Sequence, residues 1–327
     1  MKSVSETVTA SAPGKVIITG EHFVVHGAYA VAAAINRRAR VTISVNENGD
    51  SSISSRGLTS KVYSEDRSFS ASKSVVRKIF SEYGKPESPV NISVQSDIPS
   101  GSGLGSSAAV SVATTAALLR YLGQTVDPKK MFEIAIQGEK QVHGNPSGID
   151  IQTSILGGMI LFSKSSEVRQ IPISSAVQFL VVYSGRKRNT RELIARVSET
   201  KKEFPRFFEQ LTRSTSEFGL QAADAARSGD LPYLGSIMNV MQTCLSWIGV
   251  SSRAIDNLIE NFQPGDVYGA KITGAGGGGS VVVLPRPEKA EGLLRTISAR
   301  YKDSFLCALP HEGVRIERDG RSEESEK

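Results

Sequence analysis

The sequence is poor in cysteine, histidine and aromatic residues. Its 327 residues include two cysteines, four histidines and 6% aromatic residues. Cys244 and Cys307 lie far apart and outside any CxxC pattern, which excludes a disulfide framework and a thiolate metal site. We expect both thiols to pack in a hydrophobic core.

Long apolar runs are also missing. No run approaches the roughly 18 to 20 apolar residues that a membrane-spanning helix needs, and the first residues are polar where a signal peptide is apolar. We therefore expect a soluble, cytoplasmic protein with no membrane partner. The 39 basic and 33 acidic residues give a net charge of +6, which suits an anionic ligand but does not indicate nucleic acid.

The apolar content and the order of strand-like and helix-like segments predict an α+β protein with two domains. Apolar residues make up 39% of the chain, enough for a substantial core, and strand-like segments alternate with helix-like ones. Residues 16–18, 29–35 and 41–45 read as strands, so that the first 100 residues are β-rich, and Asp127 and Pro128 open a helix that ends near Gly144. Later we expect strands at 159–162 and 179–183, helices at 190–212, 215–228, 238–247, 251–262 and 287–301, and strands around the glycine run and near the end. The polar stretch 163–170 is the expected crossing between domains 1–167 and 168–327.

The first segment with chemical meaning is GSGLGSSA at residues 101–108, which runs from a glycine loop into an alanine-rich helix. Unpaired N–H groups and the positive end of the helix dipole at such a start form a cradle for phosphate. No lysine precedes the serines, so the segment is not a Walker A loop. A flexible turn with serine caps is the alternative.

The second segment, residues 12–27, places Lys15, Glu21, His22 and His26 around an apolar strand. The two histidines have the spacing of a zinc-binding helix, but Phe23 stands where the HExxH pattern needs glutamate, and the local residues disfavour a helix. The histidines could instead be structural, and Lys15 could be a solvated surface charge.

The third segment, residues 138–150, carries two carboxylates. Glu139 lies late in a helix and Asp150 follows a Gly/Pro turn, so both could reach one site and hold magnesium with substrate phosphates. Each could also be a capping or ion-pairing group, and Asp150 in particular could be a helix N-cap.

Two further segments are compatible with ligand binding. The glycine density of KITGAGGGGS at 271–280 indicates close backbone approach, to a ligand or to the other glycine loop. The basic run 185–191 fits a solvated surface or an anion site.

The segments APGKVIITGEH, PSGSGLGSSAA and KITGAGGGGS, in this order, resemble the three sequence blocks of the GHMP kinases, over nearly the whole chain. GEHFVVHG and HGNPSGID are most similar to the mevalonate kinases of that superfamily. Phe23 and Ser280 depart from the usual pattern, and we expect Phe23 to reshape the substrate pocket. The resemblance implies an N-terminal domain with a left-handed βαβ unit, a ferredoxin-like C-terminal domain, and an active site in the cleft between them.

The resemblance also implies roles for individual residues. Asp150 matches the catalytic aspartate, Lys15 the lysine that pairs with it, and Ser107 and Glu139 the Mg²⁺ ligands. Glu21, His22 and Thr190 match positions on the mevalonate side, with weaker matches at His26 and Arg188. The ATP phosphates would be held by the residues Pro99, Ser100, Gly101, Ser102, Gly103, Leu104, Gly105, Ser106, Ser107 and Ala108.

The function implied is ATP-dependent phosphorylation of the C5 hydroxyl of mevalonate in isoprenoid precursor synthesis. A related kinase acting on another hydroxyl or on phosphomevalonate is the alternative, because such enzymes share the phosphate machinery and differ in the acceptor pocket. A silent binding protein and a nucleic-acid-binding protein are less favoured. The partners expected are mevalonate and ATP, and a homodimer is compatible with the sequence.

Overall fold

The computed structural model describes residues 7–47, 49–144, 146–173, 177–186 and 190–319. Within these ranges most strands of the first half of the chain belong to one eight-stranded sheet, in the order β12-β1-β2-β5-β3-β4, and β6 and β7 extend it from β2. Its strands are β1 (Val8–Thr19), β2 (Ala30–Val45), β3 (Ser52–Ser55), β4 (Leu58–Lys61), β5 (Val90–Ser96), β6 (Met159–Phe162), β7 (Arg169–Ile171) and β12 (Arg315–Asp319).

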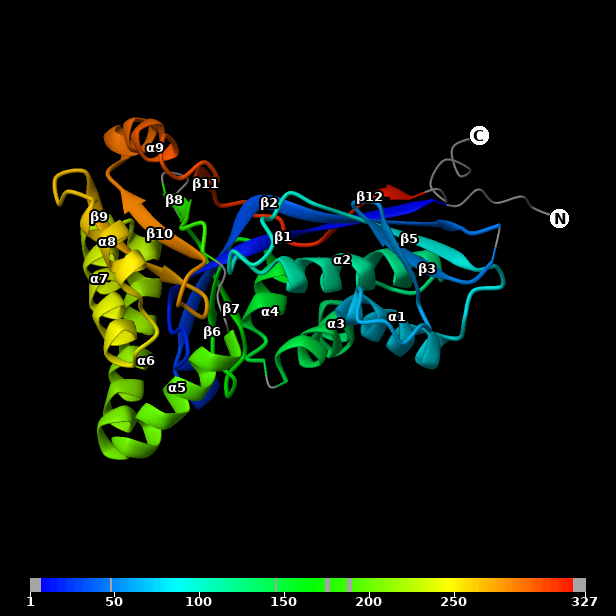
Figure 1. The fold of residues 1–327 in the computed structure, drawn as a ribbon, viewed down its shortest axis with the longest axis horizontal. Helices are drawn as coiled ribbons and strands as arrows, with labels where there is room; N and C mark the ends of the chain where they lie inside the picture. The colour runs from blue at the N-terminus through cyan, green and yellow to red at the C-terminus, as the bar shows by residue number, and fades with distance from the viewer. Residues whose placement is uncertain (1–6, 48, 145, 174–176, 187–189, 320–327) are drawn as a thin grey trace.

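Four helices cover one face of this sheet, where they lie below β1, β2 and β5 in Figure 1. They are α1 (Ser70–Tyr83), α2 (Ser106–Tyr121), α3 (Pro128–His143) and α4 (Ile149–Leu156). The small side chains of α2 let it approach β1 and β2 closely, and its alanines are buried. The parallel pair β3 and β5 is connected through α1, which gives the βαβ unit.

The C-terminal half forms a four-stranded sheet with helices. The order β11-β8-β10-β9, with antiparallel neighbours and a helix-containing connection on each side of the β9–β10 hairpin, is the predicted ferredoxin-like arrangement. Its elements are β8 (Gln178–Tyr183), α5 (Thr190–Glu203), α6 (Pro205–Ser228), α7 (Leu231–Trp247), α8 (Arg253–Glu260), β9 (Val267–Thr273), β10 (Ser280–Pro285), α9 (Ala290–Ser298) and β11 (Phe305–Ala308).

Two segments after residue 167 pair in the larger sheet. β7 is antiparallel to β6, and β12 returns from the C-terminal end to pair with β1. The division into domains 1–167 and 168–327 stays a prediction.

Several predicted boundaries differ from the structure. α1 was not expected within the β-rich first hundred residues, and the helices expected at 190–212 and 215–228 meet at Pro205 instead. Proline at the first turn starts a helix, whereas Thr212 and Thr215 continue α6 and donate their hydroxyl hydrogens to carbonyls of the preceding turn.

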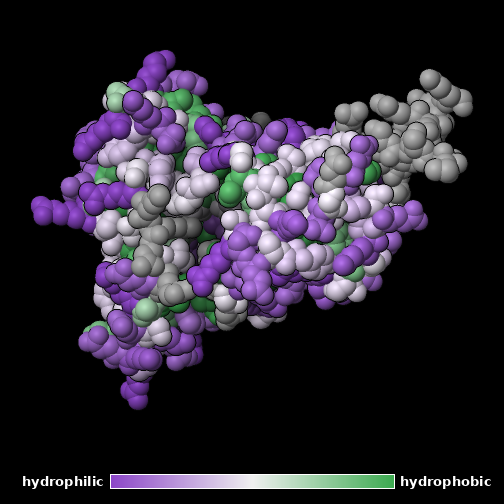
Figure 2. All heavy atoms as spheres, turned by 45° about the vertical axis from the view of Figure 1, so that its right-hand side comes forward, coloured by the Kyte–Doolittle hydropathy of each residue, from purple (hydrophilic) through white to green (hydrophobic). Residues whose placement is uncertain are grey.

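Polar and apolar side chains are separated between the surface and the core. Polar side chains cover most of the face drawn in Figure 2, and apolar ones appear there in small groups. One hydrophobic core runs through both halves and includes Cys244 and Cys307, as predicted; burial raises the pKa of the Cys307 thiol to about 12. In the described part of the chain, no helix is long and apolar enough to cross a membrane.

Candidate active site

An ion pair with a buried lysine joins the second and third sequence segments. Lys15 on β1 is 2% exposed, and its Nζ lies 3.0 Å from Asp150 Oδ1. The same ammonium donates to the carbonyl of Gly103 at 3.2 Å, and the Lys15 backbone N–H donates to the carbonyl of Leu104 at 2.9 Å. Lys15 is therefore a buried group held between a carboxylate and the glycine loop, and the alternative of a solvated surface charge is wrong.

The glycine loop leads directly into α2. Gly101, Gly103 and Gly105 have φ values of +74°, +88° and +72°, a region that favours glycine. Gly105 is the N-cap of α2 and supplies no side-chain hydrogen bond, so the alternative in which serines cap this helix is wrong. The first N–H groups of α2 have no side-chain cap, which suits an anion at the positive end of the helix.

The residues predicted to hold Mg²⁺ have suitable chemistry. Ser107 lies in the first turn of α2, and its Oγ is buried without a hydrogen-bond partner among the described residues. Glu139 on α3 is 5% exposed and lines the cavity that also contains Lys15 and Asp150. One carboxylate and one hydroxyl fit Mg²⁺, which keeps several waters and substrate phosphates as its other ligands.

Asp150 is not the cap of its helix. α4 begins at Ile149, so Gly148, with a φ of +92°, is the N-cap and Asp150 is the second helical residue. Its side chain is 29% exposed and turns to Lys15. The N-cap alternative for Asp150 is therefore wrong, and its carboxylate is available to a molecule in the cavity.

This cavity has a volume of about 590 Å³ and lies between the two halves of the chain. The N-terminal half contributes Lys15, Glu21, His22, Glu139 and Asp150, and the C-terminal half contributes α5 and the 274–275 turn. The α5 residues in its wall share one helix face, and they are Thr190, Ile194, Val197, Ser198 and Lys201. The structure thus brings together six of the predicted site residues in an interdomain cavity.

Glu21 forms a second buried ion pair, with Lys271 at the start of the last glycine segment. Both side chains are almost fully buried. Burial raises the pKa of Glu21 and lowers that of Lys271, and in each case the attraction between the two charges opposes the effect of burial. Lys271 is not among the residues predicted from the sequence, although it stands just before the glycine run in a strand of apolar residues.

The two histidines lie at the wall of the cavity without forming a zinc site. His22 has a φ of +62°, and its Nε2 is 3.0 Å from the carbonyl oxygen of Ala275. His26 Nδ1 is 3.3 Å from Lys201 Nζ, and the pKa of His26 is lowered by burial and by the charges of Lys201 and Lys164. Among the described residues, no cluster of three histidine, cysteine or acidic side chains could hold a metal ion.

Comparisons with known proteins identify the family. The models for the GHMP kinases N terminal domain and GHMP kinases C terminal match residues 70–158 and 222–303. The mevalonate kinase of Aeropyrum pernix is 34% identical over 320 residues, which cover 94% of this chain and 98% of that protein. The chain belongs to the GHMP kinase family.

Solved structures of GHMP kinases share the fold. The L. major mevalonate kinase in complex with R-mevalonate has a TM-score of 0.81 at 24% identity, covering 96% of this chain and 99% of that one. The Lactococcus lactis galactokinase complexed with galactose has a TM-score of 0.80 at 17% identity, covering 95% of each chain. Because kinases for different acceptors share this fold, the fold by itself does not select the acceptor.

Phe23 does not line the cavity: it is fully buried and packs on Phe208 of α6, with the ring centroids 5.7 Å apart, so an effect on the shape of the pocket stays a prediction. Arg188 lies outside the described residues. The glycine run approaches Val250 and Leu193 rather than the first glycine loop, since a Cβ on Gly276 or Gly277 would meet these two residues.

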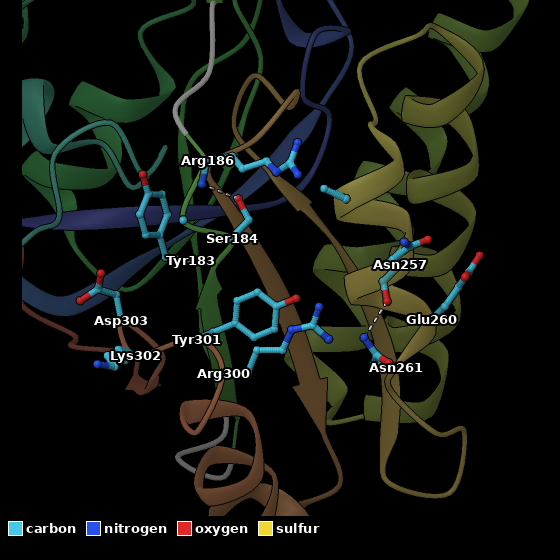
Figure 3. Close-up of a pocket in the computed structure, with 12 residues that line it drawn as sticks. Tyr183, Ser184, Arg186, Asn257, Glu260, Asn261, Arg300, Tyr301, Lys302 and Asp303 are labelled. Atoms are coloured by element: carbon cyan, nitrogen blue, oxygen red, sulfur yellow. Dashed lines mark hydrogen bonds between the residues drawn. The ribbon is translucent and has the colours of Figure 1, made fainter.

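A larger hollow of about 940 Å³ lies in the C-terminal half of this GHMP kinase (Figure 3). Arg186 and Arg300 project from opposite sides of it, and Glu260 comes from α8. These charged side chains are exposed and of both signs. Arg186 belongs to the basic run 185–191, but none of the residues matched to catalysis, ATP, Mg²⁺ or mevalonate lines the hollow. The smaller interdomain cavity, which six of the predicted site residues line, is therefore the candidate active site.

Proposed function

We propose that this protein transfers the γ-phosphoryl group of ATP to the C5 hydroxyl of mevalonate and forms 5-phosphomevalonate for isoprenoid precursor synthesis. The observation that carries the proposal is the ion pair between buried Lys15 and partly exposed Asp150, which lines a cavity and contacts the glycine loop. The near full-length similarity to a mevalonate kinase supports this acceptor.

In this mechanism Asp150 accepts the proton of the acceptor hydroxyl. A primary alcohol is a poor nucleophile, and a carboxylate within hydrogen-bond reach can take its proton as the phosphoryl group arrives. Lys15 lies behind the carboxylate, almost without solvent contact, and fixes the orientation of the carboxylate. Residues 99–108 would hold the ATP phosphates through backbone N–H groups and the start of α2.

Ser107 and Glu139 would hold Mg²⁺. When bound, Mg²⁺ neutralises charge between the β- and γ-phosphates of ATP. Glu21, His22 and Thr190 would contact mevalonate from the cavity wall. We further propose that the protein works in the cytoplasm without a nucleic-acid partner, and a homodimer stays a prediction.

The test is an acceptor panel. Purified protein with ATP and Mg²⁺ is incubated with mevalonate, phosphomevalonate, homoserine or galactose, and products are identified by mass spectrometry and NMR. We expect turnover of mevalonate to the 5-phosphate. Formation of 3-phosphomevalonate, or turnover of another acceptor alone, would contradict the proposal and favour the related-kinase alternative.

A further inference from the structure

Lys271 connects the two halves of the molecule at the wall of the cavity. Its side chain on β9 has no exposed surface. The ammonium donates to Glu21 Oε1, to the carbonyl of Ile17 at 3.3 Å and to the carbonyl of Ile272 at 2.5 Å. An ammonium has three N–H donors, and three acceptors surround this one, two of them from the N-terminal half.

The contact with Ile17 is reinforced by Thr273, two residues further along β9. Thr273 Oγ1 accepts a hydrogen bond of 2.7 Å from the Ile17 N–H. The N–H and C=O of one strand residue point to the same side, and residues two apart on a strand share a face. Lys271 and Thr273 thus bind β1 at Ile17, on the side away from β2.

This contact lies between the groups that do the chemistry. Lys15 precedes Ile17 by two residues on β1, and Glu21 follows it at the turn where β1 ends. Fixing Ile17 therefore fixes both the strand that carries Lys15 and the turn that carries Glu21 and His22. Glu21 Oε1 is occupied by Lys271, whereas Oε2 is buried without a hydrogen-bond partner in the described part of the protein.

We propose that Lys271 is a positioning residue that acts through Glu21 and Ile17 and holds the acceptor-binding wall of the cavity in place relative to Lys15 and Asp150. Its pairing with Glu21 Oε1 leaves Oε2 as the oxygen that accepts a hydrogen bond from the acceptor's non-reacting hydroxyl group. The proposal rests on the proposed kinase function. Without Lys271, the buried Glu21 carboxyl would be protonated or displaced, because an unpaired charge in the interior is strongly unfavourable.

The test compares Lys271→Met with Lys73→Met. Lys73 on α1 is a matched control: it is 3% exposed, pairs with Asp66 at 3.0 Å, and does not line the cavity. Both variants should lower the melting temperature. Only Lys271→Met should raise the KM for the acceptor, by about tenfold or more, while the Kd for ATP measured without acceptor stays within about twofold.

A second comparison separates positioning from folding. Glu21→Gln and the double variant Lys271→Met/Glu21→Gln are measured in the same way. The double variant removes both buried charges and should recover stability relative to Lys271→Met, yet its acceptor KM should stay near that of Glu21→Gln, because the two residues act as one unit. Additive effects on KM, or an acceptor KM that returns with stability, would overturn the proposal.

The acceptor used is whichever compound of the panel wild-type protein phosphorylates. If mevalonate is not phosphorylated, the proposed function is wrong. The proposal for Lys271 is then tested with the acceptor that the wild-type protein does phosphorylate. An equal loss of acceptor and ATP affinity in Lys271→Met, or a change in melting temperature alone, would show a structural role and overturn it.

Discussion

Lys15 lies behind Asp150: the two side chains form a 3.0 Å ion pair in which the lysine is 2% exposed and the aspartate 29%. The carboxylate therefore faces the cavity while the ammonium is shielded by it and by the glycine loop. In the proposed mechanism the more exposed carboxylate therefore meets the substrate, and the buried ammonium orients the carboxylate.

We predict that Asp150→Asn lowers kcat by at least about 100-fold, the lower range for loss of a general base, while the fold and most of the ATP affinity persist. Steady-state kinetics and nucleotide binding measure both effects. Asp303→Asn, an exposed site in the other hollow, is the control and should leave kcat unchanged. Turnover like that of wild type in Asp150→Asn would remove the residue from the mechanism.

Lys15→Met should act in the same direction. Because Lys15 orients the carboxylate of Asp150, removal of either residue disables one unit, and the double variant should lose far less than the product of the two single losses. Kinetics of the two single variants and the double variant complete the cycle. Independent, multiplicative losses would mean that the ion pair is not a catalytic unit.

A third prediction concerns Mg²⁺. Glu139→Gln should raise the Mg²⁺ concentration for half-maximal rate and lower kcat, because one of few protein ligands is lost. Titration at fixed free ATP measures this effect, and binding of mevalonate without ATP should change little. An unchanged Mg²⁺ curve with weakened mevalonate binding would move Glu139 to the substrate side.

A fourth prediction concerns the strand that returns to the first sheet. Arg40 donates to Glu317 on β12 at 2.5 Å and holds the pKa of that carboxyl at about 2, below its ordinary value of 4.5. A carboxyl whose pKa is lower in the folded than in the unfolded protein stabilises the fold at pH values above its pKa in the unfolded protein. This stabilisation is lost as the pH falls through the pKa of the folded protein. Glu317→Gln should therefore lower the free energy of unfolding by about 1 kcal/mol or less at neutral pH.

The pH dependence checks the cause. The difference between wild type and Glu317→Gln, measured by denaturant unfolding, should be present above about pH 4.5 and vanish as the pH approaches about 2. Glu312→Gln, which removes an exposed partner of Arg315, is the control. A difference that does not depend on pH would exclude the ion pair as its source.

Local signals predicted those parts of the fold that local chemistry determines. Asp127 accepts from the Lys130 N–H at 2.9 Å and caps α3, as expected from the Asp-Pro pair. Helix α1 was not predicted. Its N-cap, Phe69, has a left-handed backbone conformation and makes no side-chain hydrogen bond to the helix, so the usual N-cap residue is missing from the sequence at this position.

The site residues likewise divide into those that local motifs predict and one that depends on a contact between distant segments. Motifs predicted Lys15, Asp150, Glu139 and Glu21, and the structure brings all four to one cavity. Lys271 was missed because its role depends on a contact between β9 and β1, which are far apart in the sequence. Single-sequence patterns report spacing along one element, and a pairing across two domains leaves no trace in that spacing.

The last prediction separates backbone strain from contact with the catalytic lysine. Gly105 has a φ of +72°, and a Cβ there would lie 3.0 Å from Lys15 Cγ, whereas Gly229 has a φ of +77° at the end of α6 with open space around it. Alanine at either position forces a left-handed conformation and should lower the free energy of unfolding by about 1–2 kcal/mol. Only Gly105→Ala should also lower kcat, because the methyl group displaces the Lys15 side chain from Asp150. Denaturant unfolding and kinetics of both variants decide the point: equal activity in the two would mean that the loop does not position Lys15.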